Sequence, residues 1–437
     1  MSEIKQGLCR RMDDDGNGIV DKIPFPNVLP LEEIQYHPKT KKLIKRLGDA
    51  PTRVNVPCPH FAICSSCQFL HWEYDAQLEW KTEQVRELFS SITKQPVLDC
   101  LGTSLNFGYR SKNILTFKAE GKTVMGGYYA GKTHTLFDVK SCDVAHPKAM
   151  AIFSTLKTLV KDFKVEIYDE DKRKGLLRHA LIRIGARSDE ILLVLVVAHS
   201  EFKGRKNFVN ALIAKHPEIT TIIENQNSRS TSIVLGTQER TLYGKGYIID
   251  QLGEYTFKIS SRSFFQVHPT QTQVLYDLAV SSANLKKTDV LVDAYSGVGT
   301  IGIYASKHVG QVICVESNKD ATEDARANGK HNKTTNVKFV CADAAQWLLD
   351  ASTSQAKIDV VILDPPREGS DKNFLFALRK LQPRTIIYIS CNPETQVRDL
   401  KELMTLYNIK QIQPVDMFPH TSHIENVVVL NRRTNYQ

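Results

Sequence analysis

The sequence predicts an α/β protein whose C-terminal part is a doubly wound domain with a mostly parallel sheet. After about residue 258, apolar runs alternate with helical patterns, as in "DVLVDAYSG", "QVICVES", "VKFVCAD", "IDVVILDPP", "TIIYISC" and "IENVVVLN". Continuous apolar strands separated by helices are typical of a sheet covered on both faces. From about residue 100 to 257 the short β-branched runs "NILTFKA", "LIRIGAR", "EILLVLVVA" and "TSIVLGT" predict a mostly β region.

We expect three parts along the 437 residues. Residues 1–52 form a short, polar, turn-rich segment, residues 53–257 a central β-rich domain, and residues 258–437 the doubly wound domain. A helix is predicted over residues 73–91, where apolar residues recur on one face, and it is expected to pack on the C-terminal domain. A second helix is expected near "HPKAMAIFSTLKTLVKDF".

Composition points to a cytoplasmic protein. The longest apolar run, "ILLVLVVA", is too short to cross a bilayer, and the first residues lack the apolar core of a secretory signal. We therefore expect reduced thiols and no membrane association. The net charge of +9 mildly favours an anionic partner such as nucleic acid.

The ends of the predicted C-terminal strands carry a nucleotide-like site. Ligands of doubly wound sheets bind beyond the carboxyl ends of the strands. The first strand ends in "DAYSGVGTIG", which formally fits the Gly-x-Gly-x-x-Gly pattern of dinucleotide enzymes. Glu316 ends the next strand, where a carboxylate can bind ribose hydroxyls, and Asp343 follows the third. Asp293, at the mouth of the first strand, would repel a pyrophosphate but suits an ammonium, which favours S-adenosylmethionine over NAD.

Three further residues, each next to a predicted strand, suggest which reaction takes place. Asp364 begins the rigid "DPP" turn, Cys391 closes "YISC", and Glu425 follows "HTSHI". A core cysteine and an exposed turn glutamate are the plain structural alternatives. With a methyl donor, however, a thiolate can add to carbon 6 of uracil and so activate carbon 5 for methylation. A carboxylate must then remove the proton at carbon 5.

Residues 258–432 resemble the catalytic domain of the class I RNA 5-methyluridine methyltransferases. The resemblance lies in "SFFQVHPTQ", "DAYSGVGTIG", "LDPPREG", "ISCNPET" and "FPHTSHIE". It implies a Rossmann-like methyltransferase domain with Cys391 as the nucleophile and Glu425 as the base. The positions that it implies for contact with S-adenosylmethionine are Gln266, Tyr295, Thr300, Glu316, Asp343 and Asp364. Phe264 falls where a family aromatic residue packs in the RNA site.

A target base must leave its stack to reach such a pocket, so a looped RNA segment is the expected partner. Two basic stretches of the central region, "YRSKN" and "LLRHALIRIGAR", are candidates for contacts with the RNA backbone. Their candidate residues are Tyr109, Arg110, Lys112, Arg178, Arg183 and Arg187. An ordinary solvated strand face is the alternative for each of them.

Three of the nine cysteines lie within "CPHFAICSSC". Zinc knuckles would need a second Cys-x-x-Cys pair, and a thioredoxin-like redox pair would need a surrounding βαβ pattern. A fourth ligand must therefore come from elsewhere in the chain. The candidates outside the C-terminal domain are Cys9, Cys100 and Cys142. Cys314 and Cys341 lie inside apolar strands and are expected in the core.

The family resemblance extends to these cysteines. Several members carry a [4Fe–4S] cluster with the same x5, x2 spacing, and "KSCDVAHP" resembles the later segment that supplies their fourth cysteine. The ligands so implied are Cys58, Cys64, Cys67 and Cys142. The family usually has two glycines where Ser65 and Ser66 stand. Many members begin with an OB-like RNA-binding barrel called TRAM, and residues 1–52 are expected to be an abbreviated version of it.

The resemblance thus implies transfer of a methyl group from S-adenosylmethionine to carbon 5 of a uridine in 23S ribosomal RNA, by a monomer. The ribosomal target follows because cluster-bearing bacterial members act there. A T-loop uridine of tRNA is the alternative substrate. An NAD-dependent oxidoreductase with an electron-carrying cluster and a non-catalytic RNA-binding protein are rival interpretations. The motifs around Cys391 and Glu425 argue against both.

Overall fold

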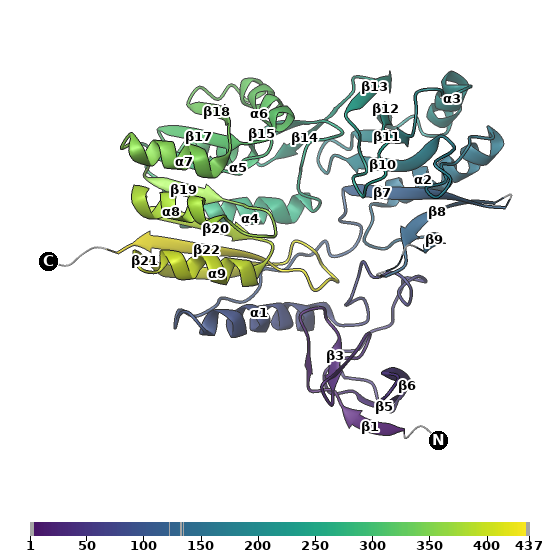
Figure 1. The fold of residues 1–437 in the computed structure, drawn as a ribbon, viewed down its shortest axis with the longest axis horizontal. Coiled ribbons are helices and arrows are strands. Elements are labelled where there is room, and N and C mark those ends of the chain that lie inside the picture. Colours follow the sequence, from purple (N-terminus) through teal and green to yellow (C-terminus); the bar gives the residue numbers. More distant parts are fainter. Residues whose placement is uncertain (1–3, 122, 132, 134, 434–437) are drawn as a thin grey trace.

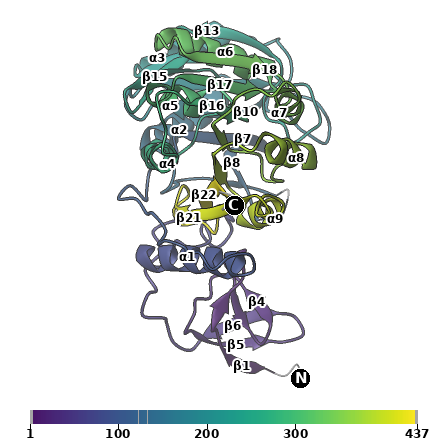
Figure 2. The same cartoon turned by 90° about the vertical axis from the view of Figure 1, so that its left-hand side faces the viewer.

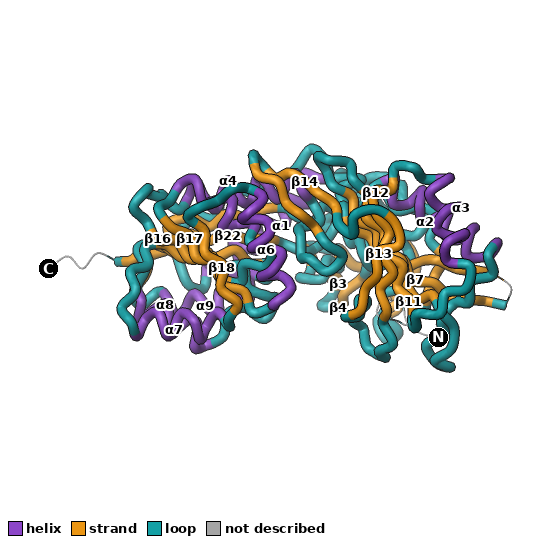
Figure 3. The backbone as a smooth tube through the Cα atoms, turned by 90° about the horizontal axis from the view of Figure 1, so that it is seen from above, coloured by secondary structure: helices purple, strands orange, loops and turns teal. Residues whose placement is uncertain are grey.

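The computed structural model describes residues 4–121, 123–131, 133 and 135–433. Two large seven-stranded sheets lie side by side, one in the central part of the chain and one in the C-terminal part (Figures 1 and 3). The N-terminal strands form two small sheets at one end of the molecule (Figure 2). Among the described residues, no helix combines the length and the apolar character needed to cross a membrane.

The N-terminal segment is more ordered than its polar, turn-rich sequence indicates. One sheet has the order β1 (Lys5–Leu8), β5 (Glu33–His37), β6 (Lys42–Arg46), and the other the order β2 (Arg11–Met12), β3 (Gly18–Val20), β4 (Ile23–Phe25). The strands enclose a small core of their own, made of Cys9, Val20, Phe25, Val28, Ile34 and Tyr36. Burial of this apolar surface holds the segment together.

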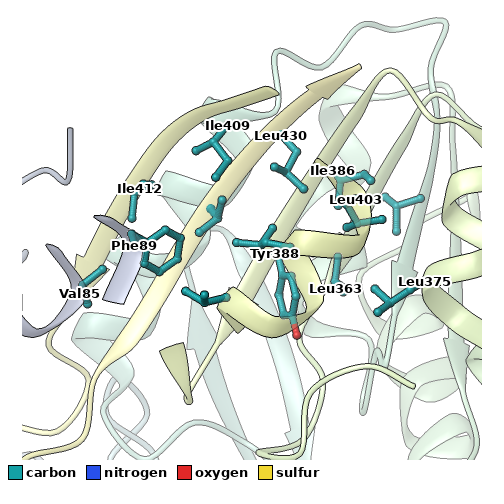
Figure 4. Packing of buried hydrophobic residues seen from close by; sticks show 14 of the residues in the cluster. Val85, Phe89, Leu363, Leu375, Ile386, Tyr388, Leu403, Ile409, Ile412 and Leu430 are labelled. Carbon is teal, nitrogen blue, oxygen red and sulfur yellow. The ribbon is translucent and has the colours of Figure 1, made fainter. Parts of the chain in front are cut away.

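Helix α1 (Tyr74–Ser90) is the helix predicted over 73–91, and it lies against the C-terminal sheet. It contacts α9 (Pro393–Leu403) and strand β21 (Tyr407–Val415). Val85 and Phe89 belong to the same hydrophobic cluster as Ile412 of β21, beside which Figure 4 shows them. A helix from the N-terminal half therefore completes the core of the C-terminal half.

The central sheet has the strand order β13-β12-β11-β10-β7-β8-β9, and only β11 and β12 pair in parallel. Its strands are β7 (Lys112–Glu120), β8 (Thr123–Tyr129), β9 (Leu136–Asp138), β10 (Leu177–Ile184), β11 (Ile191–Val197), β12 (Ile219–Gln226) and β13 (Gln238–Tyr243). Helices α2 (Pro147–Asp162) and α3 (Arg205–Lys215) pack on one face. Helix α3 was not predicted, and the strand predicted for "TSIVLGT" is wrong because residues 231–237 are irregular.

A hairpin joins the two large sheets. Strands β14 (Ile248–Leu252) and β15 (Tyr255–Ile259) pair with each other, so the expected boundary between residues 257 and 258 falls inside β15. Leu252 and Phe257 of the hairpin pack in one hydrophobic cluster with Leu192 of β11 and Leu291 of the C-terminal sheet. The second face of the central sheet is therefore buried too.

The C-terminal sheet confirms the predicted α/β class. Its order is β18-β17-β16-β19-β20-β22-β21, and its first five strands are parallel. Besides β21, the strands are β16 (Val290–Ala294), β17 (Gln311–Glu316), β18 (Val337–Cys341), β19 (Val360–Leu363), β20 (Thr385–Ser390) and β22 (Glu425–Arg432). Strand β22 runs antiparallel to both of its neighbours, β20 and β21.

Helices cover both faces of this sheet. Helices α7 (Ala344–Thr353), α8 (Lys372–Leu381) and α9 lie on one face, and α4 (Pro269–Ser282) lies on the other, as Figure 3 shows. Residues of α5 (Thr300–Ala305) pack in the same hydrophobic cluster as those of α4. Helix α6 (Lys319–His331) follows β17, and a 3-10 turn, Ser306–His308, follows α5.

Candidate active site and cysteine cavity

The register of the C-terminal sheet brings Cys391, Glu425 and Asp364 together. Cys391 directly follows β20, and Asp364 directly follows the neighbouring β19. Because β22 is antiparallel to β20, its first residue, Glu425, lies at this same edge. The pairing of Ser390 with Asn426 places Cys391 next to Glu425 across the two strands.

Burial and mutual repulsion dominate the electrostatics of these three groups. The pKa of the Cys391 thiol is raised to about 11, first by burial and then by the carboxylates of Glu425 and Asp364. Burial, followed by repulsion from Asp364, raises the pKa of Glu425 well above its usual range. Burial also raises the pKa of Asp364 to about 7. The Arg367 guanidinium opposes the shifts of Cys391 and Glu425. A carboxyl group of raised pKa beside a thiol is suited to proton transfer near neutral pH.

Cys391 lines a pocket of about 220 Å³ whose walls come from three distant parts of the chain. Residues 422–424, just before Glu425, form one wall. Trp80 of α1 and Asp14 of the β2–β3 turn also line it. These last two residues were not predicted, because no local pattern in the sequence links them to a site more than 300 residues away.

The turn between β16 and α5 has the geometry of a ligand-binding loop. Tyr295, Gly297 and Gly299 all have positive φ, at 61°, 53° and 78°. A Cβ atom added to Gly297 would meet nothing within 4 Å, so the space above it is open. At Gly302, by contrast, an added Cβ would lie 2.3 Å from Cys314 Sγ. The third glycine thus lets α5 pack closely on the sheet, as in nucleotide-binding folds.

Glu316 is fixed beside this loop. One of its carboxylate oxygens accepts a hydrogen bond from Gly297 N–H at 2.9 Å, and the other from Asn318 N–H at 2.7 Å. The side chain stays partly exposed. A carboxylate held in this way at a strand end fits the hydroxyl groups of a ribose.

The other expected cofactor residues lie along the same sheet edge, with one exception. Tyr295 follows β16, and its ring lies 5.2 Å from that of Phe374. Thr300 begins α5, and Asp343 follows β18 and caps α7 through Gln346 N–H at 2.9 Å. The exception is Gln266, which is buried in the connection between β15 and α4. The open loop, the fixed Glu316 and the partly exposed Asp364 together fit an adenosyl ligand.

Asp293 does not lie at the mouth of the strand, as the sequence analysis expected. It is buried within β16 with 1% exposure, and its Oδ2 accepts a hydrogen bond from Gly302 N–H at 2.7 Å. Its Oδ1 has no hydrogen-bond partner among the described residues. Burial raises the pKa of Asp293 to about 7. This side chain therefore supports the packing of α5, and the expected pairing with an ammonium group is wrong.

Four cysteines line a second cavity, of about 300 Å³, between the cysteine loop and the central sheet. They are Cys58, Cys64, Cys67 and Cys142. Cys9 lies in the N-terminal core and Cys100 is buried next to α1, so neither of these candidates joins them. All nine cysteines are free thiols. Cys314 is buried as expected, whereas the prediction for Cys341 is wrong, because it is exposed at the end of the edge strand β18.

The geometry of these four cysteines does not by itself show a metal site. Within the described part of the chain, no group of three or more His, Cys, Asp or Glu side chains is close enough to hold one metal ion. Four cysteine thiolates are the usual ligands of a [4Fe–4S] cluster, which is much larger than one ion. Arg110 and Lys112 also line the cavity and can offset the negative charge of four thiolates.

Three of the residues proposed for RNA contacts, namely Tyr109, Arg178 and Arg183, have structural roles instead. Arg178 is buried and donates hydrogen bonds to Glu170 and to backbone carbonyls of the neighbouring loop. Arg183 is buried and donates to a backbone carbonyl, and the buried Tyr109 hydroxyl donates to Pro419 O at 3.0 Å. Arg187 and Phe264 are exposed. The expectation of RNA contacts is therefore wrong for the three buried side chains.

The chain is similar to several known proteins. A family model described as tRNA (uracil-5-)-methyltransferase matches residues 73–433. An uncharacterized RNA methyltransferase of Staphylococcus aureus is 37% identical over 445 residues, which cover 98% of each chain. One from Staphylococcus epidermidis is 36% identical and covers 99% of this chain and 98% of its own.

A solved structure is similar over nearly the whole chain. It is the Pyrococcus abyssi tRNA (uracil-54, C5)-methyltransferase in complex with S-adenosyl-L-homocysteine. The TM-score is 0.81 and the sequence identity 27%, with 98% of this chain and 100% of that chain covered.

Proposed function

We propose a covalent mechanism for the chain, which belongs to the tRNA (uracil-5-)-methyltransferase family and is an S-adenosylmethionine-dependent RNA uracil-5-methyltransferase. In this mechanism, Cys391 forms a bond with the target uridine. The observation that supports this mechanism is the placement of Cys391 and Glu425 side by side on β20 and β22. The plain structural alternatives do not fit, because Cys391 lines a pocket and Glu425 is buried.

In the proposed reaction, the Cys391 thiolate adds to carbon 6 of the uracil ring, and the electron pair of the carbon 5–carbon 6 double bond moves to form an enolate. S-adenosylmethionine, when bound, supplies the methyl group to carbon 5. Glu425 then takes the proton from carbon 5, the double bond forms again, and the bond from carbon 6 to sulfur breaks. Arg367 favours the first step because its charge lowers the pKa of Cys391.

We assign contacts with S-adenosylmethionine to six residues. They are Gln266, Tyr295, Thr300, Glu316, Asp343 and Asp364. Five of them end or follow one of the strands β16, β17, β18 and β19, at the edge where doubly wound sheets bind ligands. Glu316 is the best supported, because two backbone N–H groups already orient its carboxylate.

We further propose that Cys58, Cys64, Cys67 and Cys142 hold a [4Fe–4S] cluster, with a structural or RNA-positioning role. The cavity that these four thiols share supports this ligand set over Cys9 or Cys100. The test compares Cys142→Ser with Cys100→Ser after anaerobic purification. Loss of iron and of the broad absorption near 400 nm only in Cys142→Ser is expected. Zinc in the wild-type protein, or full iron content in Cys142→Ser, would contradict the assignment.

We propose 23S ribosomal RNA as the substrate of a monomeric, cytoplasmic enzyme with three domains. The four cysteines support the ribosomal target, because the cluster-bearing members that this chain resembles act there. A uridine of tRNA is the second candidate, and the similarity to the Pyrococcus abyssi tRNA enzyme favours it. Methyl transfer to 23S rRNA and to tRNA transcripts, measured in parallel with the wild-type protein, separates the two.

Two variants test the covalent mechanism. Cys391→Ala is expected to bind RNA without methylating it, since no thiolate can activate carbon 5. Glu425→Gln is expected to methylate its RNA once and to remain bonded to it, so that a denaturant-resistant complex accumulates on gels. Methylation by Cys391→Ala would exclude the covalent step, and normal product release by Glu425→Gln would exclude its role as the base.

A further inference from the structure

The loop that precedes Glu425 is held by groups that lie outside the C-terminal sheet. Residues 416–424 join β21 to β22, and we call them the base loop. Val415 and Glu425, which flank the loop, are paired with each other in the hairpin register. The conformation of these nine residues therefore determines how the pocket forms in front of Glu425.

A buried ion pair holds the beginning of the base loop. Lys81 Nζ of α1 donates hydrogen bonds to Asp416 Oδ1 at 2.6 Å and to Phe418 O at 3.3 Å. The Tyr74 hydroxyl donates to Asp416 Oδ2 at 2.8 Å. The side chains of Lys81 and Asp416 have no exposed surface. Such pairs are often no more stabilising than apolar residues of similar size, and in some proteins they instead specify one geometry.

The middle and the end of the base loop are held through their backbone. His420 N–H donates to Gln77 Oε1 at 3.1 Å, and Phe69 N–H donates to His420 O at 3.0 Å. Ser422 N–H donates to Gln68 Oε1 at 3.2 Å. Burial lowers the pKa of the His420 imidazole to about 4, so its ring is neutral. Helix α1 and the residues directly after Cys67 thus fix the loop at three points.

The same helix also forms part of the catalytic pocket. Trp80, Gln84 and Leu88 of α1 line the pocket together with Cys391 and residues 422–424 of the base loop. A shift of α1 would therefore change the pocket wall and the anchor of the base loop together. Errors of about 1 Å in the placement of a catalytic group can reduce a rate by about a hundredfold.

We propose that Lys81 is a positioning residue for proton abstraction from carbon 5. Through its ion pair with Asp416 it holds the base loop in the conformation that aims the Glu425 carboxylate at the methylated adduct. The proposal rests on the function proposed for Cys391 and Glu425. It predicts that loss of the ion pair slows the removal of the carbon 5 proton more than it slows methyl transfer.

The test uses the double variant Lys81→Met/Asp416→Asn, which leaves no unpaired charge in the core. The full-length holoenzyme is mixed in a single turnover with saturating RNA that carries tritium at carbon 5 of uridine. The methyl group of S-adenosylmethionine carries carbon-14. Release of tritium is expected to slow by about tenfold to a hundredfold relative to methyl transfer, and the covalent complex to accumulate. Tyr74→Phe, which removes one hydrogen bond to Asp416, should change the ratio less and in the same direction.

The matched control is Lys157→Met/Asp138→Asn, which removes an ion pair of the central domain whose atoms lie 3.1 Å apart. Its ratio of tritium release to methyl transfer should equal that of the wild type. The proposal would be overturned if Lys81→Met/Asp416→Asn had the wild-type ratio of tritium release to methyl transfer, whatever its overall activity. Glu425→Gln distinguishes a failure of this proposal from a failure of the proposed function. If Glu425→Gln releases tritium at the wild-type rate, Glu425 is not the base at all.

Discussion

Replacing Asp293 by asparagine is expected to stabilise the folded protein at pH 7. Burial raises the pKa of Asp293 from 3.8 to about 7, so the carboxyl is ionised far more readily in the unfolded chain than in the folded one. Between these two values the folded state binds more protons, and the wild type loses stability as the pH rises. Asparagine does not ionise, and its carbonyl oxygen can still accept the hydrogen bond from Gly302 N–H.

The magnitude follows from the two pKa values. Each pH unit between them is equivalent to about 1.4 kcal/mol, so the carboxyl of Asp293 costs about 3–4 kcal/mol at pH 7. The advantage of Asp293→Asn should fade as the pH falls below 4, where the Asp293 carboxyl becomes protonated in the unfolded chain as well as in the folded one. It should grow by about 2 kcal/mol between pH 5 and pH 7.

Urea denaturation of the full chain without cofactor, at pH 5 and at pH 7, measures this difference. Asp162→Asn, at the exposed end of α2, is the control and should give the same small change at both pH values. A free energy of unfolding that differs between wild type and Asp293→Asn by the same amount at both pH values would refute the reasoning.

Two further predictions concern the same sheet edge. In Arg367→Gln, the pKa of Cys391 should rise further above about 11, so that single-turnover adduct formation slows at neutral pH and recovers toward alkaline pH. Arg367→Lys should restore the wild-type pH profile, and an unchanged profile in Arg367→Gln would show that the guanidinium does not act on the thiol. In Gly302→Ala, the added methyl group meets Cys314 Sγ, so unfolding should become easier by about 1–3 kcal/mol and cofactor binding weaker. Gly48→Ala, where a Cβ meets nothing within 4 Å, is the control, and equal stability of the two variants would contradict the close packing of α5.

The C-terminal half was predictable because its signals are local. Six apolar runs of the sequence correspond to β16, β17, β18, β19, β20 and β22. The parallel strands all end at one edge of the sheet, and the antiparallel β22 begins there, so the candidate site residues meet at that edge. Strand β21 was missed, since its sequence "YNIKQIQPV" mixes polar residues and a proline into an edge strand. Without β21, the hairpin that carries the base loop could not be foreseen.

The central half was less predictable because its sheet is buried on both faces. Arg178 and Arg183 lie in a strand whose eight residues are all buried, so basic residues there bond to protein carbonyls and not to an outside partner. Helix α3 was missed because only a few of its residues are apolar and buried. The contacts of Trp80 and Asp14 with the pocket depend on tertiary structure alone.

The attachment of α1 to the C-terminal sheet has a consequence for folding. Lys81 and Asp416 are 335 residues apart in sequence, so α1 stays without its partner until almost all of the intervening chain has been synthesised. Contacts of such high contact order form late and slowly. The catalytic pocket should therefore be among the last features to assemble, and residues 258–437 expressed alone should expose the apolar surface that Val85 and Phe89 cover.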